Sequence, residues 1–151
     1  MGIEKDINQL KFRNEYQKSI VNLIYTYNWV TEQIKVVLEE SDLTMQQFNI
    51  LRILRGSQAP ISTLQIRERM LDKMSDTSRI VDRLIIKGWA KKMICKTDKR
   101  LVDVTITPKG QKLLAIIDKQ EVQLDSIIST LTVADAKLLN KLLDKMRGSL
   151  E

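Results

Sequence analysis

The chain has 151 residues, the length of one domain, and 43% of them are hydrophobic, so a core can form without disulfides or a structural metal. With one cysteine and no histidine, the chain cannot form an intramolecular disulfide and lacks the commonest metal ligand and general base, so we predict no metal, no cofactor and no enzyme activity. The longest apolar run, residues 113–117, is far below the roughly 20 residues that span a bilayer, and no N-terminal segment resembles a signal peptide, so we expect a cytoplasmic protein without a membrane partner.

Residues 6–40 contain neither glycine nor proline, and their apolar side chains recur at alternating spacings of four and three. This heptad pattern is formed by Tyr16, Ile20, Leu23, Tyr27, Val30, Ile34 and Val37. The pattern predicts one long helix whose apolar face needs a partner helix to cover it.

Capping signals predict two shorter helices next. Thr44-x-x-Gln47 and Ser62-x-x-Gln65 both match the capping box, in which two side chains satisfy free N–H groups at a helix start. The first of these helices is expected to end at Gly56, and the second to run to about Met70. Between them, residues 59–61 predict a turn or a short edge strand.

Residues 75–88 predict a helix with an apolar face and a small, polar and basic face. The apolar residues fall at Thr77, Ile80, Val81 and Leu84, which lie on one side of a 3.6-residue period. Gly88 is placed to end the helix in a left-handed conformation. A short turn separates this helix from the preceding one, which is the helix-turn-helix arrangement that reads DNA.

A hairpin and a further helix start follow. Residues 89–95 and 101–106 predict two strands, and their connection carries Lys99 and Arg100 at its tip. Thr107-Pro108 then predicts a helix start, because the hydroxyl can cap it and proline at the first helical position loses no hydrogen bond.

The last two predicted helices are too apolar to stand alone. They cover residues 108–129 and the segment that begins with the Thr132-x-x-Asp135 cap. We expect them to join the N-terminal helix, and a second copy of all three, in a helical dimerisation domain. The predicted fold is therefore mainly α, an α+β winged helix-turn-helix at residues 44–108, with dimerisation parts at residues 1–43 and 109–151.

The charge distribution points to the partner. Residues 44–110 hold 14 Lys and Arg against 6 Asp and Glu, whereas residues 1–43 hold 5 against 7 and residues 111–151 hold 6 against 6. The whole excess therefore lies on the predicted winged segment, as expected of a surface that binds the phosphates of double-stranded DNA. The alternative is that these basic residues only form a solvated face of the protein that binds no partner.

Three pieces resemble the MarR family of bacterial transcriptional regulators. They are Ser78 to Leu84 with Lys87-Gly88, then Asp98 to Arg100, then Val104 to Gly110. In this order and spacing they are specific, and the resemblance covers nearly the whole chain. It implies an obligate homodimer that controls transcription by binding a near-palindromic site. It also implies that small, often aromatic or anionic effectors lodge between the dimerisation helices and the winged domain.

The same resemblance assigns the DNA contacts. The major-groove face is implied at Ser75, Asp76, Ser78, Arg79 and Arg83, and the wing contacts at Lys99 and Arg100, with Asp98 holding the wing arginine. A carboxylate matched to a guanidinium preorganises it for insertion, but Asp98 alternatively only caps the hairpin turn. Asp76 either favours the helix N-terminus or accepts a hydrogen bond from a cytosine N4 atom.

Two further sets of residues allow both a functional and a structural interpretation. Tyr16, Tyr27, Met45 and Phe48 are candidate effector contacts, although an apolar stripe at helical spacing is more often core. Cys95 lies in a predicted strand beside Lys92 and Lys96, which would lower its pKa, but we interpret it as an inert structural thiol rather than a redox sensor.

The function predicted is a sequence-specific DNA-binding transcriptional regulator, a ligand-responsive repressor that acts as a homodimer. A nonspecific DNA-architectural protein is one alternative, and it would spread its basic residues over the surface. A protein-interaction module derived from the same fold is the other, and it would lack the arginines Arg79, Arg83 and Arg100.

Overall fold

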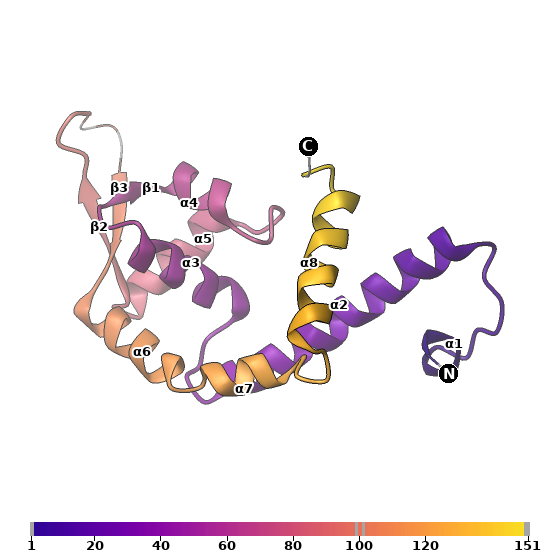
Figure 1. The fold of residues 1–151 in the computed structure, drawn as a ribbon. Helices are drawn as coiled ribbons and strands as arrows, with labels where there is room; N and C mark the ends of the chain where they lie inside the picture. The colour runs from indigo at the N-terminus through magenta and orange to yellow at the C-terminus, as the bar shows by residue number, and fades with distance from the viewer. Residues whose placement is uncertain (1, 99, 101, 150–151) are drawn as a thin grey trace.

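The computed structural model describes residues 2–98, 100 and 102–149. Figure 1 shows a lobe built from the middle of the chain and two helical arms, α2 and α8, that cross beside it. The elements are α1 (Ile3–Asp6), α2 (Glu15–Glu39), α3 (Met45–Gly56), β1 (Ile61–Ser62), α4 (Thr63–Arg69), α5 (Thr77–Ile86), β2 (Ala90–Ile94), β3 (Val102–Ile106), α6 (Pro108–Asp118), α7 (Glu121–Ser126) and α8 (Val133–Met146). The fold is thus mainly helical with one small sheet, as predicted.

The sheet has three antiparallel strands in the order β1-β3-β2. The hairpin pairs Ala90 with Ile106 and Ile94 with Val102, so both strands fall inside the predicted ranges. The edge strand predicted near residues 59–61 is also present, because Ile61 of β1 pairs with Val104 of β3. Residues 95–98, which follow β2, project from the lobe as part of the wing (Figure 1).

Local capping signals are confirmed. Thr44 with Gln47 and Ser62 with Gln65 form complete capping boxes, and Thr132 with Asp135 forms a third. The pKa of Asp135 is lowered, because its carboxylate accepts hydrogen bonds from the Thr132 hydroxyl and backbone N–H. These contacts span only three residues, which is why the sequence reveals them.

The long helix predicted from the heptad pattern is α2, which begins at Glu15 and contains the whole pattern from Tyr16 to Val37. Asn14 caps this helix by accepting from the Gln17 N–H at 2.9 Å, and Asn8, nearer the N-terminus, adopts a positive φ of 53°. The separate short helix α1 is held to α2 by a Glu4–Lys18 ion pair. That pair lowers the pKa of Glu4 and raises that of Lys18, chiefly through their hydrogen bond.

The helix expected over residues 108–129 is divided into α6 and α7. The break falls at Lys119 and Gln120, and the Gln120 side chain donates to the Glu40 carboxylate at 3.2 Å. This break redirects the chain so that α7 packs beside the C-terminal end of α2 (Figure 1).

The hydrophobic core lies mainly within the lobe. Its fully buried side chains include Ile50, Leu51, Ile66, Leu84, Val104 and Leu114. The arms, in contrast, leave large apolar side chains in solvent, among them Tyr16, Ile20 and Tyr27 of α2 and Leu138, Leu142 and Met146 of α8. Within the described residues, no helix is long and apolar enough to cross a membrane.

Candidate nucleic-acid interface

Helix α5 is seated by one apolar face and capped at its start. Thr77, Val81 and Leu84 are buried against the lobe. The Asp76 carboxylate accepts a hydrogen bond from the Arg79 backbone N–H at 3.2 Å. The capping interpretation of Asp76 is therefore confirmed, and the helix begins at Thr77 rather than at Ser75, because a capping residue lies outside the helix it caps.

The turn before α5 is fixed by hydrogen bonds centred on Asp72. Its backbone carbonyl accepts from the Ser75 N–H at 3.3 Å and from the Ser75 hydroxyl at 2.8 Å. Its carboxylate accepts from the Met74 N–H at 3.0 Å. Asn49 of α3 accepts from the Leu71 N–H at 2.9 Å, which ties the turn to the lobe. The start of α5 thus has a defined position relative to α3.

The outer face of α5 carries the predicted DNA contacts. Ser78, Arg79 and Arg83 are exposed, whereas Ser75 is half-buried by its bonds to the turn. Among the described residues, no carboxylate lies within ion-pair distance of the Arg79 or Arg83 guanidinium. Two cationic groups on a rigid helix are therefore free to meet phosphates or base edges.

The C-terminal end of α5 is joined to α6 by short polar contacts. Gly88 adopts a positive φ of 75°, as predicted for a left-handed cap. Its carbonyl accepts from the Thr107 hydroxyl at 2.6 Å, and the same hydroxyl oxygen accepts from the Gly110 N–H at 3.1 Å. Lys109 donates to the Lys87 carbonyl at 2.9 Å, close to the negative end of the α5 dipole.

Gly110 is required by a close approach of two backbones. A Cβ atom at this position would lie 2.3 Å from the Trp89 carbonyl oxygen, which backbone geometry cannot accommodate without a shift. Lys87 adds a further link, because its ammonium pairs with the Asp42 carboxylate at 2.7 Å and lies 4.7 Å from the Trp89 ring centroid. The segment 104–110, found as a motif in the sequence, therefore fixes α5 against α6.

The wing is attached to α5 and carries an exposed arginine. Lys92 of β2 pairs with Asp82 of α5 at 2.7 Å. The Arg100 side chain is 92% exposed, and its Nε atom donates to the Asp98 carboxylate at 3.4 Å. The same carboxylate oxygen accepts from the Arg100 backbone N–H at 3.0 Å, so Asp98 both caps the turn and contacts the guanidinium. Lys99, the other predicted wing contact, lies outside the described residues.

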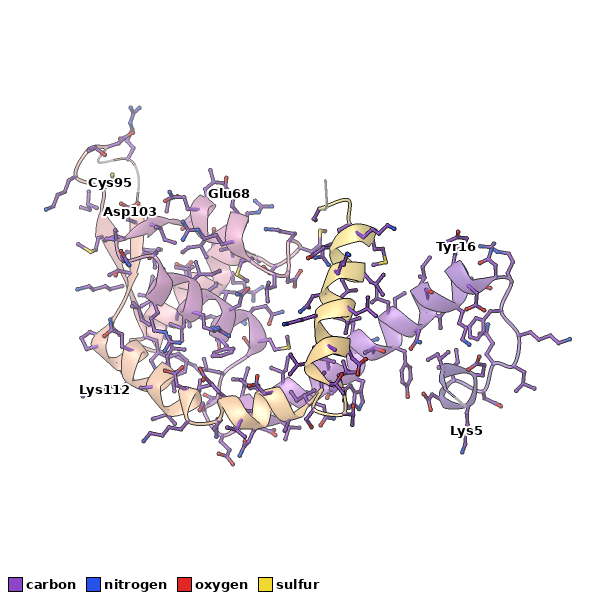
Figure 2. The ribbon with its side chains drawn as sticks, in the orientation of Figure 1. Lys5, Tyr16, Glu68, Cys95, Asp103 and Lys112 are labelled. Carbon is purple, nitrogen blue, oxygen red and sulfur yellow. The ribbon has the colours of Figure 1, made fainter. Side chains whose placement is uncertain are left out.

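Cys95 lies one residue beyond β2, near the base of the wing (Figure 2), and not within the strand as expected. Its half-buried thiol is 3.1 Å from the Thr97 hydroxyl. The pKa of Cys95 is lowered mainly by that hydroxyl and then by the backbone N–H groups of Asp98 and Thr97. The lowering of this pKa comes from hydrogen bonds at the turn and not from the neighbouring lysines that the sequence suggested.

The four candidate effector residues do not lie together. Tyr27 and Met45 line a cavity of about 780 Å³ between α2, the start of α3 and the turn before α5. Tyr16 lies near the far end of α2 (Figure 2), and Phe48 packs against the core with Arg52 over its ring. The other residues of this cavity were missed because they come from three separate segments of the chain.

The model of the MarR family matches residues 43–102. An uncharacterized HTH-type transcriptional regulator, YpoP of Bacillus subtilis, is 24% identical over 115 residues, covering 76% of this chain and 80% of that protein. The multiple antibiotic resistance protein MarR of Salmonella typhimurium is 30% identical over 89 residues, covering 58% of this chain and 61% of that protein.

Solved structures agree in fold. A MarR-like transcription regulator from Bacillus cereus superposes with a TM-score of 0.80 at 21% identity, covering 91% of this chain and 99% of that one. A mutant MarR from Escherichia coli in complex with operator DNA superposes with a TM-score of 0.72 at 25% identity, covering 82% and 90%.

The fold, the exposed basic face of α5 and the wing define a DNA-binding protein of the winged helix-turn-helix class. Residues 43–102 match the MarR family, and the chain, which is similar to regulators of that family, is a DNA-binding transcription regulator. Members of this family are regulators of transcription and not enzymes.

Proposed function

We propose that this regulator is a ligand-responsive repressor that binds a near-palindromic operator as a homodimer in the cytoplasm. The observation that carries the proposal is the set of exposed guanidinium groups of Arg79, Arg83 and Arg100 on a lobe whose elements hold them in place. Arg79 and Arg83, with Ser75, Asp76 and Ser78, face the major groove, while Arg100 and Lys99 reach the adjacent minor groove.

Dimerisation is supported by the uncovered apolar faces of the arms. On α8, Leu138 is 55% exposed and Leu142 is 54% exposed, and no side chain of α8 is buried. A single copy thus leaves a leucine face in water, at a cost of about 25 cal/mol per Å² of apolar surface. We assign residues 1–43 and 109–151 to the paired dimerisation domain and residues 44–108 to DNA binding.

A two-fold dimer presents two copies of α5 to the DNA. Two-fold symmetry of the protein favours an inverted repeat whose half-sites lie about one helical turn, roughly 10 bp, apart. Occupying such a stretch excludes other proteins from it, and we therefore propose repression as the outcome of binding.

Response to a ligand is supported by the turn before α5. Leu71, Asp72 and Lys73 line the cavity, and Asp72 also holds Met74 and Ser75 through its carboxylate and carbonyl. A ligand that contacts this wall acts on the same groups that place the start of α5. Its binding therefore changes the position of α5 relative to the DNA.

The proposal is tested by footprinting the purified protein on DNA that flanks its coding region. We expect protection of an inverted repeat with two half-sites about 10 bp apart. Equal protection of unrelated DNA would instead indicate a nonspecific architectural protein. If the protein binds no DNA even at low salt, the proposed repressor function is contradicted. That result would favour the alternative, a protein-interaction module.

A further inference from the structure

The cavity between α2, α3 and the turn has an apolar wall. Its volume of about 780 Å³ is in the range of sites for drug-sized ligands. The wall is formed by Tyr27, Leu43, Met45, Met70 and Leu71. Methionine side chains adapt to the shape of a ligand, and a tyrosine ring attracts a cation through its π-face. The site therefore suits a ligand with a bulky apolar body.

The charged groups of this cavity have the opposite balance from the lobe around it. Four carboxylates and two ammonium groups line it, and no arginine does; they are Glu32, Glu39, Asp42, Asp72, Lys35 and Lys73. Residues 44–110, by comparison, have more than twice as many basic as acidic residues. Three of the four carboxylates come from residues 1–43, which hold 7 acidic against 5 basic residues, so the cavity lies where this acidic segment meets the basic lobe.

Two of the four carboxylates remain available to a ligand. Asp42 is paired with Lys87 at 2.7 Å, and Asp72 accepts the Met74 N–H. Glu32 and Glu39 lie on α2 and form no ion pair with any residue that the structure describes.

The cationic groups of the cavity are less available. Lys73 already donates to the Glu68 carbonyl. Lys35, one helical turn from both glutamates, offsets only part of their charge. The negative charge at the α2 side of the cavity is therefore not neutralised.

The start of α3 also faces the cavity, and a helix N-terminus favours an anion. The capping box of α3 already occupies part of this site, because Thr44 accepts the Gln47 N–H and Gln47 accepts the Thr44 N–H, both at 3.1 Å. A tightly bound carboxylate or phosphate usually meets the planar fork of an arginine, which this lining lacks.

We propose that this cavity binds a lipophilic organic cation. The charged centre lies between the Glu32 and Glu39 carboxylates, and the apolar body rests on Tyr27 and Met45. This assignment rests on the proposed ligand response and names the class of effector. It differs from the anionic ligands that the family resemblance implies, because the carboxylates of this chain select against them.

The test uses two probes of the same shape and opposite charge, tetraphenylphosphonium and tetraphenylborate. Each is titrated calorimetrically into the full-length protein without DNA. We expect the cation to bind at least about tenfold more tightly than the anion. The double variant Glu32→Gln/Glu39→Gln should weaken binding of the cation about tenfold, because both carboxylates lose their charge. Glu15→Gln, on the same helix but outside the cavity, is the matched control and should leave binding unchanged.

Equal or tighter binding of tetraphenylborate would overturn the assignment, and so would an equal loss in the Glu15→Gln control. Release of a labelled operator, followed by fluorescence anisotropy, separates the two proposals. Binding of the cation without release of operator would contradict the ligand response and leave the cation site standing. Release by the anion alone would contradict the cation site and leave the ligand response standing.

Discussion

The Asp98 carboxylate accepts two hydrogen bonds from Arg100, one from its backbone N–H at 3.0 Å and one from its guanidinium Nε at 3.4 Å. The shorter bond shapes the turn, and the longer one directs a side chain that is otherwise 92% exposed. One carboxylate therefore combines the two roles that the sequence leaves as alternatives. We expect the guanidinium contact to account for more of its effect on DNA binding than the turn does.

We expect Arg100→Ala to weaken operator binding and to lower the slope of log affinity against log salt by about one unit, because one cationic contact is lost. Asp98→Ala should weaken binding less and leave the slope nearly unchanged, since the cation remains but is no longer directed. The double variant should lose little beyond Arg100→Ala alone. Titration of the four proteins against one operator at three salt concentrations provides the measurement.

Asp98→Asn is the control for the turn. Its amide oxygen still accepts the Arg100 backbone N–H but carries no charge to hold the guanidinium. We expect a melting temperature like that of the unmodified protein, together with part of the affinity loss of Asp98→Ala. Strictly additive free energies in the double variant would contradict a coupled wing.

Arg79 is the residue best placed to meet a base edge, because it follows the capped start of α5 and its side chain is exposed. Arg79→Ala should lose about 1–3 kcal/mol of binding free energy on the operator and much less on random DNA. Lys112→Ala, on α6 away from the wing (Figure 2), is a matched loss of one positive charge and should change neither affinity. An equal loss of binding free energy on the operator and on random DNA would indicate that Arg79 contacts a phosphate and not a base edge.

A charge on the leucine face of α8 should separate the two copies. Leu139→Asp and Leu142→Asp place a carboxylate where the dimer buries it without a partner, which costs a few kcal/mol. Sedimentation should change from twice 17.5 kDa to a single 17.5 kDa chain at micromolar concentration, with loss of operator binding. Because Leu139 is already 41% exposed in one copy, the chain itself should remain folded by circular dichroism.

Lys137, Lys141 and Lys145 form a row of lysines along α8 beside its leucine face. Lys141→Glu, which changes a charge in this row, is the control for this experiment. It should remain dimeric. A folded unmodified protein that sediments as a monomer would contradict the proposed architecture.

Gly110→Ala should destabilise the lobe, because the added Cβ would lie 2.3 Å from the Trp89 carbonyl oxygen and force a backbone shift. Overpacking of this kind costs about 1–3 kcal/mol in the free energy of unfolding. Gly56→Ala is the matched control: nothing lies within 4 Å of its Cβ, so it should raise stability slightly, by up to about 1 kcal/mol. Urea unfolding of the two variants measures both changes.

The sequence predicts most of the local structure of this protein. The capping boxes at Thr44 and Ser62, the left-handed Gly88 and the strands of the hairpin depend on residues a few positions apart, so their signals are complete within a short window. The basic excess on residues 44–110 and the exposed arginines of α5 are likewise readable from composition and periodicity.

The tertiary structure determines which charged side chains form ion pairs and which do not. Lys87 pairs with Asp42, 45 positions away, and Lys92 pairs with Asp82, whereas Glu32 and Glu39 line the cavity and form no ion pair with any described residue. The break between α6 and α7 also follows from packing against α2, since the residues there are compatible with a continuous helix. Helix periodicity sets which face of a segment is apolar, but ion pairs and cavities arise from segments distant in the chain, and only the folded arrangement brings those together.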